Sequence, residues 1–156
     1  MNQLNRAFNY LTVICLICVV SVSITYAYDK NADPKIDYLQ SIKSAQQSGK
    51  LVLIVFGANW CKDCKAFDKQ IKRKLKEVIK ANYELVKVDV GNFDRNLDFV
   101  SKFGNPISNG IPSIVIVNNE KTILFATKAG EFASMRNIDE DSLLDFFIAM
   151  SSKLKK

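Results

Sequence analysis

Residues 51–56 form an unbroken apolar run, from Leu51 to Phe56, between two segments with helical spacing. A run of this length that is apolar on both alternate faces is typical of a strand buried on both sides of a sheet. Helices must then cover both faces, because the side chains above and below the strand would otherwise contact water. The run therefore constrains the chain to a layered α/β architecture.

The rest of the sequence supplies the layers around this strand. The spacing predicts helices over 34–48, from Cys61 to about 81, over 94–103 and from 139 to about 152. It predicts strands over 51–56, 84–90, 114–117 and 122–125, the last two joined as a hairpin. Strands that alternate with helices favour a mainly parallel sheet, and a chain of 156 residues needs only one such domain.

Residues 1–27 have a different character. Arg6 precedes an apolar run over 11–24, which is followed by Thr25-Tyr26-Ala27, with a small residue at the presumed cut, and then by polar sequence from Tyr28. This pattern predicts a secretory signal peptide cut after Ala27. The run is shorter than the about 20 residues of a membrane span, so an uncleaved N-terminal anchor is the alternative. We expect residues 28–156 to be periplasmic or secreted, or anchored facing the periplasm, with membrane contact only if the segment is uncleaved.

The sequence contains no histidine, which excludes Ser–His–Asp and Cys–His catalysis and imidazole-bound metal sites. Two of its cysteines, Cys15 and Cys18, lie in the predicted signal peptide, so the mature domain keeps Cys61 and Cys64. A ring closed between residues this close contributes little loop-closure stabilisation. A pair at this spacing can be redox-active. The alternatives are that it forms half of an intermolecular zinc site, or that it is a permanently oxidised structural disulfide. We expect no metal and no organic cofactor.

The segment Trp60-Cys61-Lys62-Asp63-Cys64 lies where the apolar strand gives way to an amphipathic helix. Free amide groups and the dipole at a helix N-terminus favour a thiolate, so Cys61 is expected to be the reactive cysteine. Cys64, one turn later, can attack a mixed disulfide at Cys61 and release its substrate. Lys62 favours the thiolate and Asp63 opposes it; we expect both to be exposed and their net effect to be under about 1 kcal/mol.

A second motif, Gly110-Ile111-Pro112, directly precedes the predicted strand over 114–117. Together with the Trp-Cys-x-x-Cys-Lys string that ends at Lys65, it makes the chain resemble the thioredoxin superfamily, and its extracytoplasmic members most of all. The resemblance runs from about residue 34 to residue 150. It implies a central mixed four-stranded sheet flanked by helices, with a cis Ile111–Pro112 bond opposite the CxxC pair.

The resemblance also implies roles for individual residues. Cys61 would be the nucleophile and Cys64 the resolving thiol, whereas Trp60, Ile111 and Pro112 would contact an extended substrate peptide. The implied activity is thiol–disulfide exchange with protein thiols or disulfides, in a direction that the sequence does not fix. In the reducing direction it would need an electron donor such as a membrane thiol-transfer protein. The alternative is a thioredoxin-like module that binds peptides without redox turnover. Nucleic acid is not expected as a partner, because the lysines are not interleaved with exposed aromatic residues.

Three departures from the family pattern bear on the site. Val55 occupies the position of the buried carboxylate of thioredoxin, and Lys87 that of its partner lysine. Lys87 would then lack its acid and either point to solvent or favour a nearby thiolate. The segments 105–109 and 127–139 are longer than in a minimal thioredoxin, and form either a substrate rim or plain surface loops.

The predicted helix after Cys61 is strongly basic. Eight basic and three acidic residues over 62–80 indicate a solvated helix face, or a surface that steers an acidic partner or an anionic membrane toward the protein.

Overall fold

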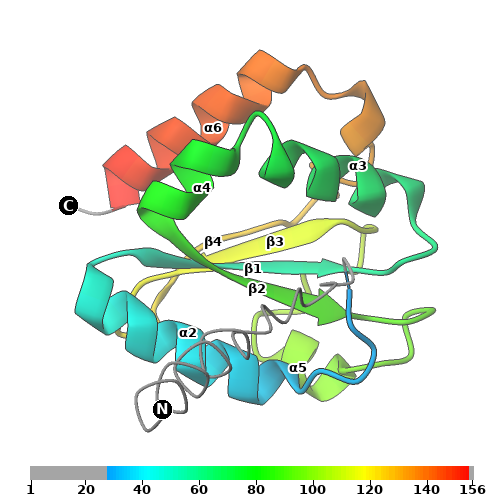
Figure 1. The fold of residues 1–156 in the computed structure, drawn as a ribbon. Coiled ribbons are helices and arrows are strands. Elements are labelled where there is room, and N and C mark those ends of the chain that lie inside the picture. The colour runs from blue at the N-terminus through cyan, green and yellow to red at the C-terminus, as the bar shows by residue number, and fades with distance from the viewer. Residues whose placement is uncertain (1–27, 155–156) are drawn as a thin grey trace, which may run out of the picture.

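Four strands form the centre of the fold in the computed structural model, which describes residues 28–154 (Figure 1). They are β1 (Leu51–Gly57), β2 (Tyr83–Asp89), β3 (Ser113–Val117) and β4 (Ile123–Ala126), in the spatial order β2-β1-β3-β4. The predicted signal peptide lies outside the described residues. Within them, no helix combines the length and the apolarity that crossing a bilayer requires.

The sheet is mixed, so the expectation of a mainly parallel sheet is wrong. Only β1 and β2 are parallel, whereas β3 is antiparallel to both β1 and β4. The first residue of β3, Ser113, pairs with Phe56 near the end of β1, so the chain enters β3 at the same edge at which it left β2. The intervening helix α5 (Leu97–Ser101) is about 8 Å long, and it does not return the chain to the opposite end of the sheet. The strand β3 therefore runs antiparallel to β1.

Helices cover both faces of the sheet, which confirms the four-stranded mixed sheet flanked by helices. In Figure 1, α5 and α2 (Pro34–Ser48) lie on one face, and α3 (Lys62–Lys72), α4 (Lys76–Asn82) and α6 (Glu140–Leu154) on the other. The predicted bounds of α2 are confirmed. Its start is capped by the Asp33 side chain, which accepts a hydrogen bond from the Lys35 amide, and Gly49 ends it at φ 69°.

The single helix predicted from Cys61 to about 81 is instead two helices, α3 and α4. The break falls at Arg73, with φ −121° and ψ −95°. The sequence spacing of Phe67, Ile71, Leu75 and Val78 predicts one apolar stripe, but the break shifts its phase. Ile79 is buried and Val78 is only half-buried. Leu75 remains fully buried. In α6, the helical spacing predicts that Leu143, Phe147 and Ile148 face the core. Leu143 and Phe147 are buried, but Ile148 is 45% exposed.

The core explains how the site is held. All seven residues of β1 are buried, as the apolar run predicts. On the α6 side, the Phe67 ring of α3 stacks between those of Phe132 and Phe147 at centroid distances of 5.9 and 6.0 Å. These contacts hold α3, which begins directly after Cys61, against α6 and the segment that contains Phe132.

Candidate active site

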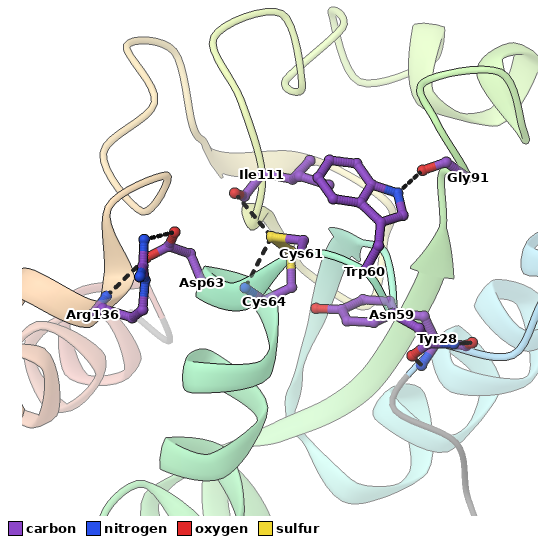
Figure 2. The surroundings of a disulfide bond; sticks show 9 residues. All are labelled: Tyr28, Asn59, Trp60, Cys61, Asp63, Cys64, Gly91, Ile111 and Arg136. Carbon is purple, nitrogen blue, oxygen red and sulfur yellow. Dashed lines mark hydrogen bonds and ion pairs between the residues drawn. A yellow bond between two sulfur atoms is a disulfide. The ribbon is translucent and has the colours of Figure 1, made fainter.

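The two cysteines lie at the start of α3, directly after the carboxyl end of β1. Cys61 is the N-cap of this helix, and its Sγ accepts a hydrogen bond from the Cys64 amide at 3.1 Å. The two side chains form a disulfide with a Cα–Cα separation of 5.2 Å (Figure 2). Because the first amides of a helix have no backbone acceptor, they are available to stabilise a thiolate at Cys61 once the disulfide is opened.

The two sulfur positions differ in their access to solvent. Cys64 is fully buried, whereas Cys61 is 5% exposed and lines a surface hollow of about 460 Å³. The two long segments, 105–109 and 127–139, both line surface hollows. Ala133 and Arg136 line this hollow, and residues of 105–109 line a neighbouring one. An incoming sulfur therefore reaches Cys61 first, with Cys64 behind it.

The loop that precedes β3 faces the disulfide. The Ile111–Pro112 peptide bond is cis, and the Ile111 carbonyl oxygen lies 3.5 Å from the Cys61 Sγ. In the dithiol form this distance allows the thiol to donate a weak hydrogen bond to that carbonyl. Both residues of the bond are buried. The structure thus brings Ile111 and Pro112, distant in sequence, to the sulfurs.

Trp60 forms a further wall of the hollow. Its Nε1 donates a hydrogen bond to the Gly91 carbonyl at 2.8 Å, and its ring lies 6.3 Å from that of Phe93. Its polar atom is thereby held in place while 54% of the residue stays exposed. Phe93, 42% exposed, is a site residue that the sequence analysis did not single out. Its only sequence signal is its place in the loop directly after β2.

Comparisons with known proteins match this arrangement. A sequence profile described as thioredoxin-like matches residues 33–119. The chain belongs to the thioredoxin-like family. Among solved structures, it is similar to a disulphide isomerase from Xylella fastidiosa Temecula1, with 38% identity, 83% of this chain and 99% of that chain covered, and a TM-score of 0.78.

A second solved structure shares the fold of this thioredoxin-like chain. It is the C-terminal domain of DsbD from Neisseria meningitidis in the oxidised form, with 14% identity and a TM-score of 0.51, covering 76% of this chain and 96% of that one. A comparison with curated proteins found no match.

Three further contacts of this thioredoxin-like site were not predicted from the sequence. They are made by the side chains of Asp63 and Lys87 and by Tyr28.

Asp63 was expected to be exposed, but Arg136 covers its side chain. Asp63 accepts hydrogen bonds from the Arg136 amide at 3.0 Å and from Nε and Nη2 at 3.2 and 3.3 Å, and 15% of its side chain is exposed. The backbone hydrogen bond, assisted by the guanidinium, holds the pKa of Asp63 below its usual range. Its charge is therefore matched by Arg136. Sequence analysis missed Arg136, which lies 73 residues further along the chain. Lys62 is exposed, as expected.

Lys87 does not lack an acid. Its Nζ pairs with Asp68, which also binds Lys72 at 2.7 Å. Asp68 lies one helical turn after Cys64 on α3 and is only 7% exposed. Burial alone would raise the pKa of its carboxyl, but the two lysines outweigh burial and lower it. Lys87 therefore has an acid partner on α3, although its usual partner position is Val55.

Tyr28, the first residue after the predicted cleavage point, is part of the thioredoxin-like domain. Its amide donates to the Asn59 Oδ1 at 3.2 Å, and the Asn59 Nδ2 donates to its carbonyl at 2.6 Å (Figure 2). The ring is 1% exposed and lies directly over Gly57. Burial, with a smaller effect of Asp68, raises the pKa of its phenol. Tyr28 therefore holds the turn that leads into Cys61.

Proposed function

We propose that the protein is a thiol–disulfide oxidoreductase that exchanges disulfides with protein substrates through Cys61 and Cys64. One observation carries the proposal: a disulfide joins a helix-capping, solvent-reachable cysteine to a buried one a turn later. A purely structural disulfide would gain nothing from this asymmetry, whereas exchange chemistry requires it. The similarity to a disulphide isomerase supports the same activity.

In the reducing direction, the Cys61 thiolate attacks one sulfur of a substrate disulfide. A Cys61–substrate disulfide forms, and the second substrate sulfur leaves as a thiolate that takes a proton from solvent. The deprotonated Cys64 then attacks the Cys61 sulfur and releases the first substrate sulfur as a thiolate. Two electrons pass from the dithiol to the substrate, and the Cys61–Cys64 disulfide is formed. The same steps in reverse donate a disulfide.

Other residues of the site serve binding and reactivity in this proposal. The exposed ring of Trp60 and the buried Ile111–Pro112 loop contact the substrate segment that carries the attacked sulfur. Lys62 and Asp63 modulate the Cys61 thiolate, with the Asp63 charge matched by Arg136. Lys87 modulates the reactivity of the cysteine pair together with its ion-pair partner Asp68, which follows Cys64 on α3. No metal or organic cofactor takes part in these steps.

We place the protein outside the cytoplasm, periplasmic or secreted, on the evidence of the predicted signal peptide, or membrane-anchored if residues 1–27 are uncleaved. Disulfides persist in such compartments. Sustained reduction of substrates there needs an external electron donor, for which a membrane thiol-transfer protein is the suitable class.

Insulin reduction with dithiothreitol tests the proposal. The wild type should accelerate the reaction, and Cys61→Ser should remove the acceleration because no thiolate can start the exchange. Cys64→Ser should instead accumulate mixed disulfides with substrate proteins, since Cys61 still attacks but nothing resolves the product. Equal rates for wild type and Cys61→Ser would refute the proposal and favour a peptide-binding module.

A further inference from the structure

The hollow at Cys61 adjoins a second one. The neighbouring hollow, of about 560 Å³, shares Phe93 and Gly110 with the first and extends along Leu97 and Ile107. Arg136 and Cys61 line the first hollow and Leu97 lines the second, and we call the two hollows together the trough. Because Trp60 and Arg136 lie on opposite sides of Cys61 (Figure 2), the trough offers contacts to the residues that flank a substrate cysteine.

One end of the trough combines exposed apolar side chains with the polar residues Ser101, Asn105 and Ser108. Seven large hydrophobic residues are exposed in the described chain, and three of them gather here: Trp60 at 54%, Phe93 at 42% and Leu97 at 46% exposed. The buried Ile107 side chain adds to the same lining. Exposed apolar residues that cluster beside a reactive centre indicate a surface that a partner covers.

The other end is cationic. Lys62 is exposed, and 59% of the Arg136 side chain is exposed. Arg136 contacts Asp63 through Nε and Nη2, which leaves the Nη1 hydrogens of its guanidinium available to a further acceptor. Lys62, Asp63 and Arg136 are the charged residues that line this hollow in the described chain, so its net charge is positive. Figure 2 shows the two ends on opposite sides of Cys61, with Trp60 on one and Arg136 on the other.

We propose that this trough selects its substrate by the residues that flank the reacting cysteine. The favoured segment carries a large apolar residue on one side of that cysteine and an acidic residue on the other. The apolar residue covers Phe93 and Leu97, while the carboxylate lies near Lys62 and the free edge of Arg136. This inference rests on the proposed thiol–disulfide exchange, and it adds the class of polypeptide on which the exchange acts.

Synthetic peptides test the proposal. Each holds one cysteine in a mixed disulfide with a coloured aromatic thiol, flanked by Leu or Ser on one side and by Glu or Lys on the other, in both orders. Release of the coloured thiol by the reduced full-length protein, followed over a single turnover, gives the second-order rate constant of the exchange. In one of the two orders we expect Leu to exceed Ser by about tenfold and Glu to exceed Lys by about two- to fivefold at low salt. The Glu preference should decrease at high salt.

Matched variants assign each preference to its end of the trough. Leu97→Ser should reduce the Leu preference, whereas Ile123→Ser, equally exposed at 44% on β4 and outside the trough, should not. Lys62→Gln should reduce the Glu preference, whereas Lys69→Gln, exposed further along the same helix, should not. Each comparison uses a ratio between two peptides for one variant, so a change in the intrinsic reactivity of Cys61 cancels.

Two failures can be distinguished. If wild type accelerates insulin reduction but reduces all the peptides at equal rates in both orders, this proposal is wrong and the proposed function stands. Equal effects of the trough variants and their controls would also overturn it. If wild type neither accelerates insulin reduction nor reduces any peptide faster than Cys61→Ser does, the proposed function itself fails.

Discussion

The contact between Tyr28 and Gly57 gives a sharp test of how the N-terminus of the domain supports the site. A Cβ added at Gly57 would lie 2.3 Å from the Tyr28 Cζ, 2.5 Å from its Oη and 2.6 Å from its Cε1. Gly57 ends a buried strand, where alanine is otherwise acceptable. The cost of Gly57→Ala therefore comes from the ring, which must move or leave its place.

The magnitude follows from the two limits. Overpacking with partial relaxation costs about 1–3 kcal/mol, and complete loss of a buried aromatic ring costs about 3–5 kcal/mol. We expect Gly57→Ala to lower the free energy of unfolding by about 3 kcal/mol, between these limits. Tyr28→Ala alone should lower it by about 3–5 kcal/mol. In the double variant the added methyl group occupies space that the ring has left, so it should cost under about 1 kcal/mol more.

Urea unfolding of the four proteins measures this coupling. Ile123→Ala in place of Gly57→Ala is the control, because Ile123 is exposed on β4 and should add independently to Tyr28→Ala. Strict additivity of Gly57→Ala and Tyr28→Ala would refute the reasoning, since it would mean that the ring does not lie over Gly57.

Three further predictions concern the charged residues of the site. The pKa of Asp68 is lowered in the folded state, so its stabilising contribution is complete above its usual pKa of about 4 and is lost as the pH falls through the lowered folded value. Asp68→Asn should therefore reduce the acid-side loss of unfolding free energy, measured by urea titrations at several pH values; an unchanged pH profile would contradict the ion-pair argument. Lys87→Met should cost about 1.5–3 kcal/mol, because it removes a charged hydrogen bond from a carboxylate that is 10% exposed, whereas Lys72→Met, with a side chain 58% exposed, should cost under about 1 kcal/mol in the same assay. Equal losses would argue against the difference in burial. Arg136→Gln should slow alkylation of reduced Cys61 by iodoacetamide at neutral pH, because the unmatched Asp63 charge then disfavours the thiolate, and Asp63→Asn in that background should restore the rate; a single variant that alkylates like wild type would speak against this role.

Local pattern determined a large part of this molecule. The apolar run over 51–56 specifies a buried strand, and Pro34 with Gly49 bounds a helix, because these signals act between neighbours in the chain. The position of Cys61 at the cap of α3 follows from the same signals. The candidate redox pair could therefore be predicted from local signals, whereas the mixed sheet of the thioredoxin-like fold was predicted only through the family resemblance.

Sequence pattern alone failed where the outcome depended on direction or phase. Periodicity marks a helix between two strands, but it does not say whether that helix crosses the sheet, and the short α5 does not. Periodicity likewise predicts one apolar stripe on one helix over 61–81, and it gives no sign that the helix breaks at Arg73. Such features depend on how whole elements pack against one another.

Tertiary structure alone decided the electrostatics of the site. Arg136 meets Asp63 across 73 residues, and Lys87 meets Asp68 across 19, so neither pair leaves a periodic trace in the chain. Tyr28 reaches Asn59 across 31 residues in the same way. The chain specifies which side chains can react, because reactivity begins with residue type and local backbone. Which charges surround them is decided only when the fold brings distant segments within hydrogen-bond distance.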